Sequence, residues 1–152
     1  MKYFLIILVL NIIPKISFSQ KVNCDLSISG AVIVQSNEGK FLTLKATLKN
    51  DSNETIDYLS KTCSYEEFYF DNSKYLEIQG SDCDKNIGTI FFLEPKQSRT
   101  VILKFKILAK SRKLKLKVGF KLIPISGKDL SFHSAEKLKI IKVLSNQIEI
   151  II

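Results

Sequence analysis

The chain has 152 residues, 45% of them hydrophobic and 25% charged, which are values of a globular protein rather than a disordered or membrane-embedded one. It carries 23 basic and 15 acidic residues, for a net charge of +8. Residues 20–95 hold seven basic and twelve acidic side chains, whereas residues 96–142 hold fourteen basic and two acidic ones. Three cysteines and one histidine leave little material for a metal centre or for imidazole-based catalysis.

The first residues have the order of a secretory signal peptide. A positively charged start precedes an apolar run, and Ser17 and Ser19 supply small side chains before a cleavage site. The apolar run is about ten residues long, roughly half of what a bilayer-spanning helix needs. We therefore expect residues 1–19 to be removed and residues 20–152 to form one soluble domain, periplasmic or extracellular, without stable membrane insertion.

Hydrophobic and polar side chains alternate along most of the exported part, as they do in strands with one buried and one wet face. Gly30 and the pair Ser145-Asn146 interrupt this alternation, so the first and last strands are expected to be bent or bulged. Many short strands with this spacing predict an all-β, immunoglobulin-like antiparallel sandwich of seven to nine strands. Turn-forming clusters place these strands at about 22–34, 41–49, 55–60, 65–70, 74–79, 88–93, 100–109, 113–123 and 137–151.

Three segments carry a resemblance to a known group of proteins. Leu44–Asn50 with the turn that follows it, Leu93–Ser98 and Ser145–Ile150 resemble strand and turn motifs of small secreted bacterial immunoglobulin-like proteins of unknown function. More distantly, they resemble the BsuPI proteinase-inhibitor domain. The resemblance covers roughly residues 40–152, implies the sandwich fold and transfers no catalytic residue.

The three cysteines allow three disulfide pairings, and export permits a disulfide to form. Cys63 and Cys83 both lie in polar, turn-rich surroundings, so this pairing is the one we predict. Cys24 shares the apolar side of its strand with Leu26 and Ile28, which favours a buried small side chain. An intermolecular bridge and a reactive thiol stay open as alternatives for Cys24.

Catalysis and metal binding have weak support. His133 is the only imidazole, and a lone loop histidine is usually a solvated side chain. The spacing of Asp82, Asp84 and Asn86 matches the start of a calcium loop, but the later glycine and glutamate of that loop are replaced by Ile87 and Leu93. We expect no enzyme activity, no cofactor and no metal.

Lysines alternate with apolar residues in the two strands predicted at 100–109 and 113–123. Because only a few residues separate these strands, we expect a hairpin that brings the lysines to one basic face. Such a face attracts anionic polymers or membrane surfaces, whereas nucleic acid is not expected because no aromatic side chain interleaves the lysines. The alternative is that lysines only keep the wet strand faces soluble. The candidate residues are Lys104, Lys106, Lys113, Lys115, Lys117 and Lys121.

A second surface candidate is a group of aromatic side chains, most of which we expect in the core: Tyr58, Tyr65, Phe68, Tyr69, Phe70 and Tyr75. Together these features indicate an exported, non-catalytic binding or interaction module. Its expected partner is a protein or an anionic polymer of the cell envelope. Proteinase inhibition is the alternative that the more distant resemblance implies.

Overall fold

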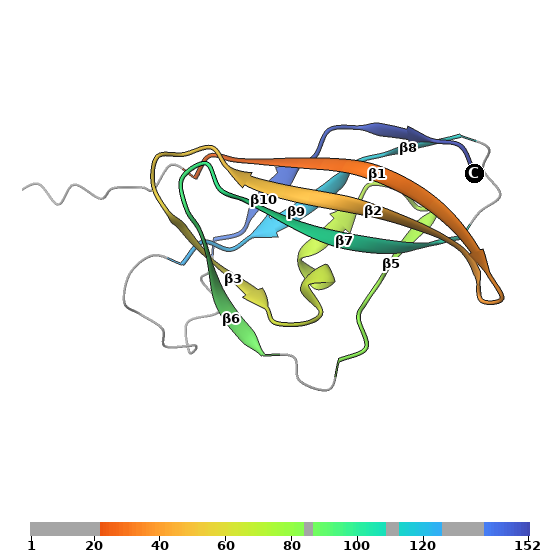
Figure 1. Ribbon diagram of the computed structural model, residues 1–152, viewed down its shortest axis with the longest axis horizontal. Helices are drawn as coiled ribbons and strands as arrows, with labels where there is room; N and C mark the ends of the chain where they lie inside the picture. Colours follow the sequence, from red (N-terminus) through yellow and green to blue (C-terminus); the bar gives the residue numbers. More distant parts are fainter. Residues whose placement is uncertain (1–21, 84–86, 109–112, 126–138) are drawn as a thin grey trace, which may run out of the picture.

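The computed structural model describes residues 22–83, 87–108, 113–125 and 139–152, and these form an all-β antiparallel sandwich (Figure 1). One layer is a four-stranded sheet in the order β1-β2-β7-β5. Its strands are β1 (Cys24–Ser36), β2 (Gly39–Asn50), β7 (Ser98–Ile107) and β5 (Leu76–Gln79).

The opposite layer consists of short strands that continue one another. β9 pairs with β10 and β4, and β8 pairs with β11. Lys117 alone separates β8 from β9, and Ser145 bridges the break between β10 and β11 by hydrogen bonds to the backbone of Val118 at 2.8 and 3.0 Å. The strands are β4 (Tyr69–Asp71), β8 (Leu114–Leu116), β9 (Val118–Leu122), β10 (Ile141–Leu144) and β11 (Ile148–Ile150).

A separate pair, β3 (Ile56–Lys61) with β6 (Gly88–Leu93), lies at one end of the sandwich (Figure 1). A backbone hydrogen bond of 2.9 Å from Leu59 to Ile123 ties β3 to the chain after β9. No helix in the described ranges is long and apolar enough to cross a membrane.

The core fills the space between the two layers and follows the predicted alternation. Every second side chain of β2 and β7 points into the core from the four-stranded sheet. From the opposite layer, every second side chain of β8 and β9 does the same, without a break in the alternation. Burying this apolar surface is the main favourable contribution to the stability of the sandwich. The innermost side chains include Leu26, Leu42, Leu44, Leu48, Leu103, Phe105, Leu116, Val118 and Leu122.

The predicted irregularities of the first and last strands are confirmed. The register between β1 and β2 shifts between Ser29 and Val32, where Gly30 takes a φ of +63°. This positive φ suits glycine, which has no Cβ to clash. In the last strand, the break at Asn146 turns its side chain onto β1, where it accepts a hydrogen bond of 2.8 Å from the Ile28 amide.

Three details of the predicted fold are wrong. The described residues contain eleven strands rather than seven to nine, because two predicted strands, 113–123 and 137–151, are each divided in two. Tyr65–Phe68 forms one turn of 3₁₀ helix, η1, instead of the start of a strand, and only Tyr69–Asp71 pairs. The third error concerns β7 and β8, which we expected to form a hairpin.

β7 pairs with β2 and β5, whereas β8 pairs with β11 in the opposite layer. The physical reason lies in the apolar faces: Leu103 of β7 and Leu116 of β8 are both fully buried. Placing the two strands in opposite layers lets both faces cover one core from two sides. The immunoglobulin-like strand arrangement remains a prediction.

Candidate functional site

The six predicted lysines lie on or beside strands of both layers, and the pairing expected to unite them is not formed. Lys104 and Lys106 are on β7 of the four-stranded sheet, and the other four are on or beside β8 and β9. Two of those four face an acidic partner: Glu149 of β11 lies 2.7 Å from the Lys113 amine and 3.9 Å from the Lys115 amine. Whether any of these lysines binds a ligand remains a prediction.

The outer face of the four-stranded sheet is a surface that combines charge with exposed apolar groups. Cross-strand pairs place side chains on this face in rows, because directly opposite residues of antiparallel strands point to the same side. One row runs Val34, Phe41, Lys106 and Glu77, and the next runs Val32, Thr43, Lys104 and Gln79. A third row pairs Lys45 with Ile102.

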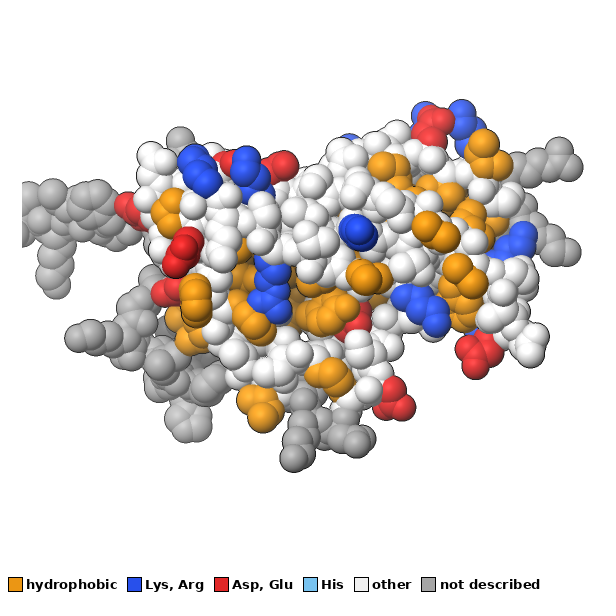
Figure 2. All heavy atoms as spheres, in the orientation of Figure 1, with side chains coloured by type: hydrophobic (Ala, Val, Ile, Leu, Met, Phe, Trp, Pro, Cys, Tyr) orange, Lys and Arg blue, Asp and Glu red, His pale blue; other side chains and the backbone are white. Residues whose placement is uncertain are grey.

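We call the apolar and basic side chains of these three rows the apolar–basic patch. Val32, Val34 and Ile102 are 55%, 51% and 56% exposed, which is unusual for three β-branched side chains on one face of a sheet. Figure 2 shows hydrophobic and basic side chains gathered on the right-hand half of this face, over β1, β2 and β7. The patch consists of Val32, Val34, Phe41, Lys45, Ile102, Lys104 and Lys106.

Within the patch, a lysine covers an aromatic ring. The Lys104 amine lies 4.3 Å from the centre of the Phe41 ring, which is only 6% exposed. The attraction between a cation and the ring face, together with the packed lysine stem, holds this charge in place at the centre of the patch. Glu77 is the acidic residue in the three rows, so their balance is basic.

The other half of the same sheet face is polar and compensated. Thr47 and Thr100 share a hydrogen bond of 2.9 Å between their hydroxyls. Lys49 forms an ion pair of 2.6 Å with Asp51 and lies opposite Asp25 of β1. This half therefore offers a matched control surface, with the same sheet geometry but neither exposed apolar groups nor unbalanced charge.

The predicted disulfide is present between Cys63 and Cys83, whose Cα atoms are 6.3 Å apart. It joins the chain before η1 to the chain after β5. Beside it, Glu66 is buried and accepts a hydrogen bond from Ser81, while its second carboxylate oxygen has no partner among the described residues.

The described ranges contain no group of three or more histidine, cysteine or acidic residues that would hold a metal ion. Lys61 pairs with the neighbouring Glu67 at 2.5 Å. Three residues considered for catalysis or calcium binding, His133, Asp84 and Asn86, lie outside the described residues.

Cys24 opens β1 as a half-buried free thiol. Burial, and secondly the negative charge of Asp51, raises the pKa of this thiol to about 11. Because the thiolate is the reactive form, a thiol that stays protonated at neutral pH is a poor nucleophile. This environment agrees with the packing role that is predicted for Cys24 from its position on the apolar side of its strand.

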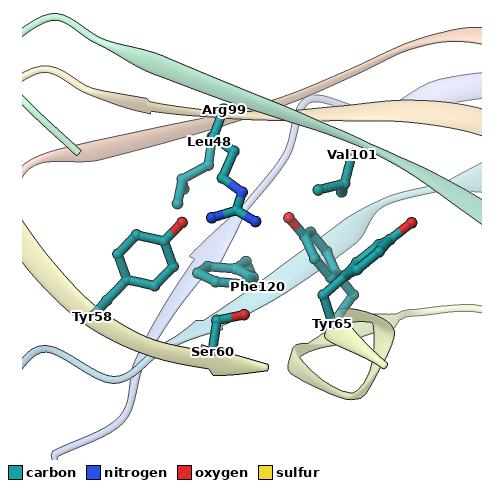
Figure 3. A pocket seen from close by; sticks show the side chains of 8 residues that line it. Leu48, Tyr58, Ser60, Tyr65, Arg99, Val101 and Phe120 are labelled. Carbon is teal, nitrogen blue, oxygen red and sulfur yellow. The ribbon is translucent and has the colours of Figure 1, made fainter. Parts of the chain in front are cut away.

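A hollow lies beneath the four-stranded sheet, among the predicted aromatic group (Figure 3). Arg99 of β7 points into it, and its guanidinium lies 3.7 Å from the centre of the Phe91 ring. In Figure 3 the guanidinium lies between the Tyr58 and Tyr65 side chains, with Ser60 and Phe120 on the opposite wall. The lining residues are Leu48, Tyr58, Ser60, Tyr65, Tyr69, Arg99, Val101 and Phe120.

The sequence interpretation included the tyrosines of this hollow but missed Arg99. The signal was available: Arg99 has the same parity as Val101, Leu103 and Phe105, whose alternation marks the buried side of the strand. An arginine in such a series places a positive charge on the core-facing side of a sheet. The strand predicted at 100–109 begins one residue after Arg99, and its apolar series begins at Val101, so the prediction leaves Arg99 out.

No protein-family model matches this chain, and no curated protein matches it. Among solved structures, the chain is similar to a crystal structure of a protein from Archaeoglobus fulgidus, with 14% sequence identity and a TM-score of 0.37. The alignment covers 83% of this chain and 95% of that one. A similarity of this size identifies neither a family nor a function, and the resemblance to BsuPI-like domains remains a prediction.

Proposed function

We propose that the protein is an exported, non-catalytic binding module that holds an acidic partner protein of the cell envelope on its apolar–basic patch. The observation that carries this proposal is the exposure of Val32, Val34 and Ile102 beside three lysines on one sheet face. Apolar side chains grouped in this way leave surface in water that a partner can cover.

Charge decides which class of partner fits. A second copy of the chain would bring the same lysines, Lys45, Lys104 and Lys106, against each other, and like charges disfavour that contact. An acidic partner is attracted instead. The lysines then steer the encounter and select the partner, while the exposed apolar side chains supply most of the affinity.

The exposed apolar groups also favour a protein over an anionic polysaccharide. A polysaccharide satisfies the lysines but leaves Val32, Val34 and Ile102 without apolar contact. A protein with both acidic and apolar side chains satisfies the whole patch, as interfaces with an apolar centre and a polar rim do.

The experiment compares capture from envelope extract by four forms of the protein. Ile102→Asp removes an apolar group from the patch, and Lys45→Gln removes a charge beside it. Thr100→Asp is the matched control, because Thr100 is the next outward-facing residue of β7 but lies in the compensated half. Partners captured by the wild type are purified and their affinity for each variant is measured.

We expect the wild type to capture an acidic protein. Its affinity should fall by about tenfold or more with Ile102→Asp, because an apolar interface anchor contributes about 1.4 kcal/mol or more, and should stay within about threefold with Thr100→Asp. Equal loss with both variants would refute the patch as the binding surface. Binding to heparin or anionic liposomes with no protein partner would favour the polymer alternative, and inhibition of a proteinase panel would favour the inhibitor alternative.

A further inference from the structure

The inner hollow holds a positive charge without a counter-ion in the described structure. Arg99 lies on the core-facing side of β7, opposite Leu48 of β2. No aspartate or glutamate of the described residues forms an ion pair with it. Taking a charge partly out of water is costly, so buried and half-buried charges are normally paired. The contact with the Phe91 ring and a hydrogen bond to the Tyr58 hydroxyl offset only part of that cost.

The groups that face Arg99 are hydrogen-bonding hydroxyls on aromatic walls. Tyr58 and Tyr69 are 2% and 7% exposed, and Ser60 is 4% exposed. Burial raises the pKa of Tyr69, and burial also raises the pKa of Tyr58 against the opposing charge of Arg99. Both phenols therefore stay protonated at neutral pH and keep a hydrogen to donate.

We propose that this hollow is a binding site for a carboxylate group, held by the Arg99 guanidinium and by the hydroxyls of Tyr58, Tyr69 and Ser60. A guanidinium binds a carboxylate through two parallel hydrogen bonds, and neutral hydroxyls donate to the remaining lone pairs. The site is distinct from the apolar–basic patch, which lies on the opposite face of the same sheet.

The size of the hollow restricts the ligand to a small planar anionic group. Its total empty volume is about 280 Å³, much of it open to solvent, and the interior space suits about one water molecule. One carboxylate oxygen, similar in size to a water molecule, therefore enters the interior, while the rest of the group and its molecule stay in the part that is open to solvent. A tetrahedral phosphate also pairs with arginine, but it is bulkier than a planar carboxylate and fits this small hollow less well.

The edge of β7 gives the ligand a way in. β5 pairs with β7 only from Lys104 to Ile107, so the first half of β7 has no strand on that side among the described residues. Instead the Tyr65 hydroxyl donates a hydrogen bond of 3.0 Å to the Ile102 carbonyl. This single side-chain hydrogen bond, rather than a paired strand, lies along this edge of β7, and the Arg99 and Tyr65 side chains are partly accessible to solvent.

The test is an NMR titration of the protein with sodium acetate, N-acetylalanine and inorganic phosphate, each at constant ionic strength. The signals followed are the Arg99 side-chain NεH and the backbone amides of Ser60 and Tyr69. Arg99→Gln removes the fork, and Arg99→Lys keeps the charge if the glutamine variant does not fold. Lys49→Gln, on the opposite sheet face and outside the apolar–basic patch, is the matched control for loss of a positive charge.

We expect saturable shifts of these signals with acetate, with a dissociation constant on the order of 1 mM for so small a ligand. Arg99→Gln or Arg99→Lys should weaken binding by about tenfold or more, whereas Lys49→Gln leaves it unchanged. Tighter binding of N-acetylalanine would indicate the end of a polypeptide as the source of the carboxylate, and equal binding a small acid.

Three results would overturn the proposal. The first is the absence of a saturable shift in the wild type. The second is an equal response of the wild type and both Arg99 variants. The third is phosphate binding at least as tight as acetate binding, which would show a general attraction of anions rather than a carboxylate site.

Discussion

Asn50 is the polar residue on which the end of the sandwich depends, and its replacement gives a sharp test of the structure. Its side chain is fully buried. The amide nitrogen donates to the carbonyls of Leu93, Glu54 and Glu94 at 2.8, 2.8 and 3.2 Å. The amide oxygen accepts from the backbone and hydroxyl of Ser52 at 2.9 and 2.6 Å. One side chain therefore joins the turn after β2 to the turn between β6 and β7.

Asn50→Ala leaves these partners without their hydrogen bonds. An orphaned buried acceptor costs about 1–3 kcal/mol, and here one carbonyl bond is fully buried while the others lie nearer to solvent. We expect the free energy of unfolding to fall by about 2–4 kcal/mol. Asn50→Asp should cost more at neutral pH, because it turns a carboxylate oxygen toward three carbonyl oxygens. Ser52→Ala, the control, should cost less than about 1.5 kcal/mol.

Urea unfolding followed by circular dichroism measures these differences, provided that the slope of the transition stays constant among the variants. A loss below about 1 kcal/mol for Asn50→Ala would show that water replaces the side chain at no cost. An aspartate variant as stable as the wild type would contradict the assignment of the amide nitrogen to the three carbonyls.

Three further predictions concern other parts of the sandwich. A Cβ added at Gly119 would lie 2.1 Å from the Phe70 ring, so Gly119→Ala should destabilise the protein by about 1–3 kcal/mol in urea unfolding. Adding Phe70→Leu to that variant should recover part of the loss, and additive losses would contradict the contact. Reduction of the Cys63–Cys83 disulfide, which closes a separation of 20 residues, should cost about 3 kcal/mol, whereas an unchanged urea midpoint in reductant would refute it. The Cys24 thiol, whose pKa is raised to about 11, should react slowly with iodoacetamide at pH 8 and faster as the pH rises toward 11. The free energy of unfolding should also fall over this range, because the thiol of the unfolded chain ionises at a lower pH than that of the folded chain. Rapid modification at pH 8 without unfolding would contradict its burial.

Local features of the fold were predictable because they depend on short stretches of sequence. The alternation of β2 and of β8 with β9, the bulge at Gly30 and the break at Ser145 are each set by neighbouring residues. The turn at Tyr65–Phe68 was not predictable in this way, because four aromatic and acidic residues read equally well as a strand. Its helical turn is held by contacts with β3, β4 and β9.

The partnership of strands could not be predicted from alternation alone. Alternation shows which side of β7 and β8 is buried, but two strands that share a core satisfy it equally well side by side or face to face. The observed pairing places Lys113 and Lys115 beside Glu149 of β11 instead of beside Lys104 of β7. The apolar–basic patch could not be predicted for a related reason. Whether Val34 and Ile102 are buried or exposed depends on which face of their sheet the other layer covers, and alternation alone does not show this.

The most direct test of the proposed function is site-specific photo-crosslinking from the outer face of β7 in the native envelope. A photo-crosslinking amino acid replaces Ile102 in one form of the protein and Thr100 in another, two neighbouring outward-facing positions on the same strand. We expect one acidic envelope protein to be linked through position 102, with little or none through position 100. Equal labelling from both positions, or labelling of many unrelated proteins, would contradict a specific binding role for the apolar–basic patch.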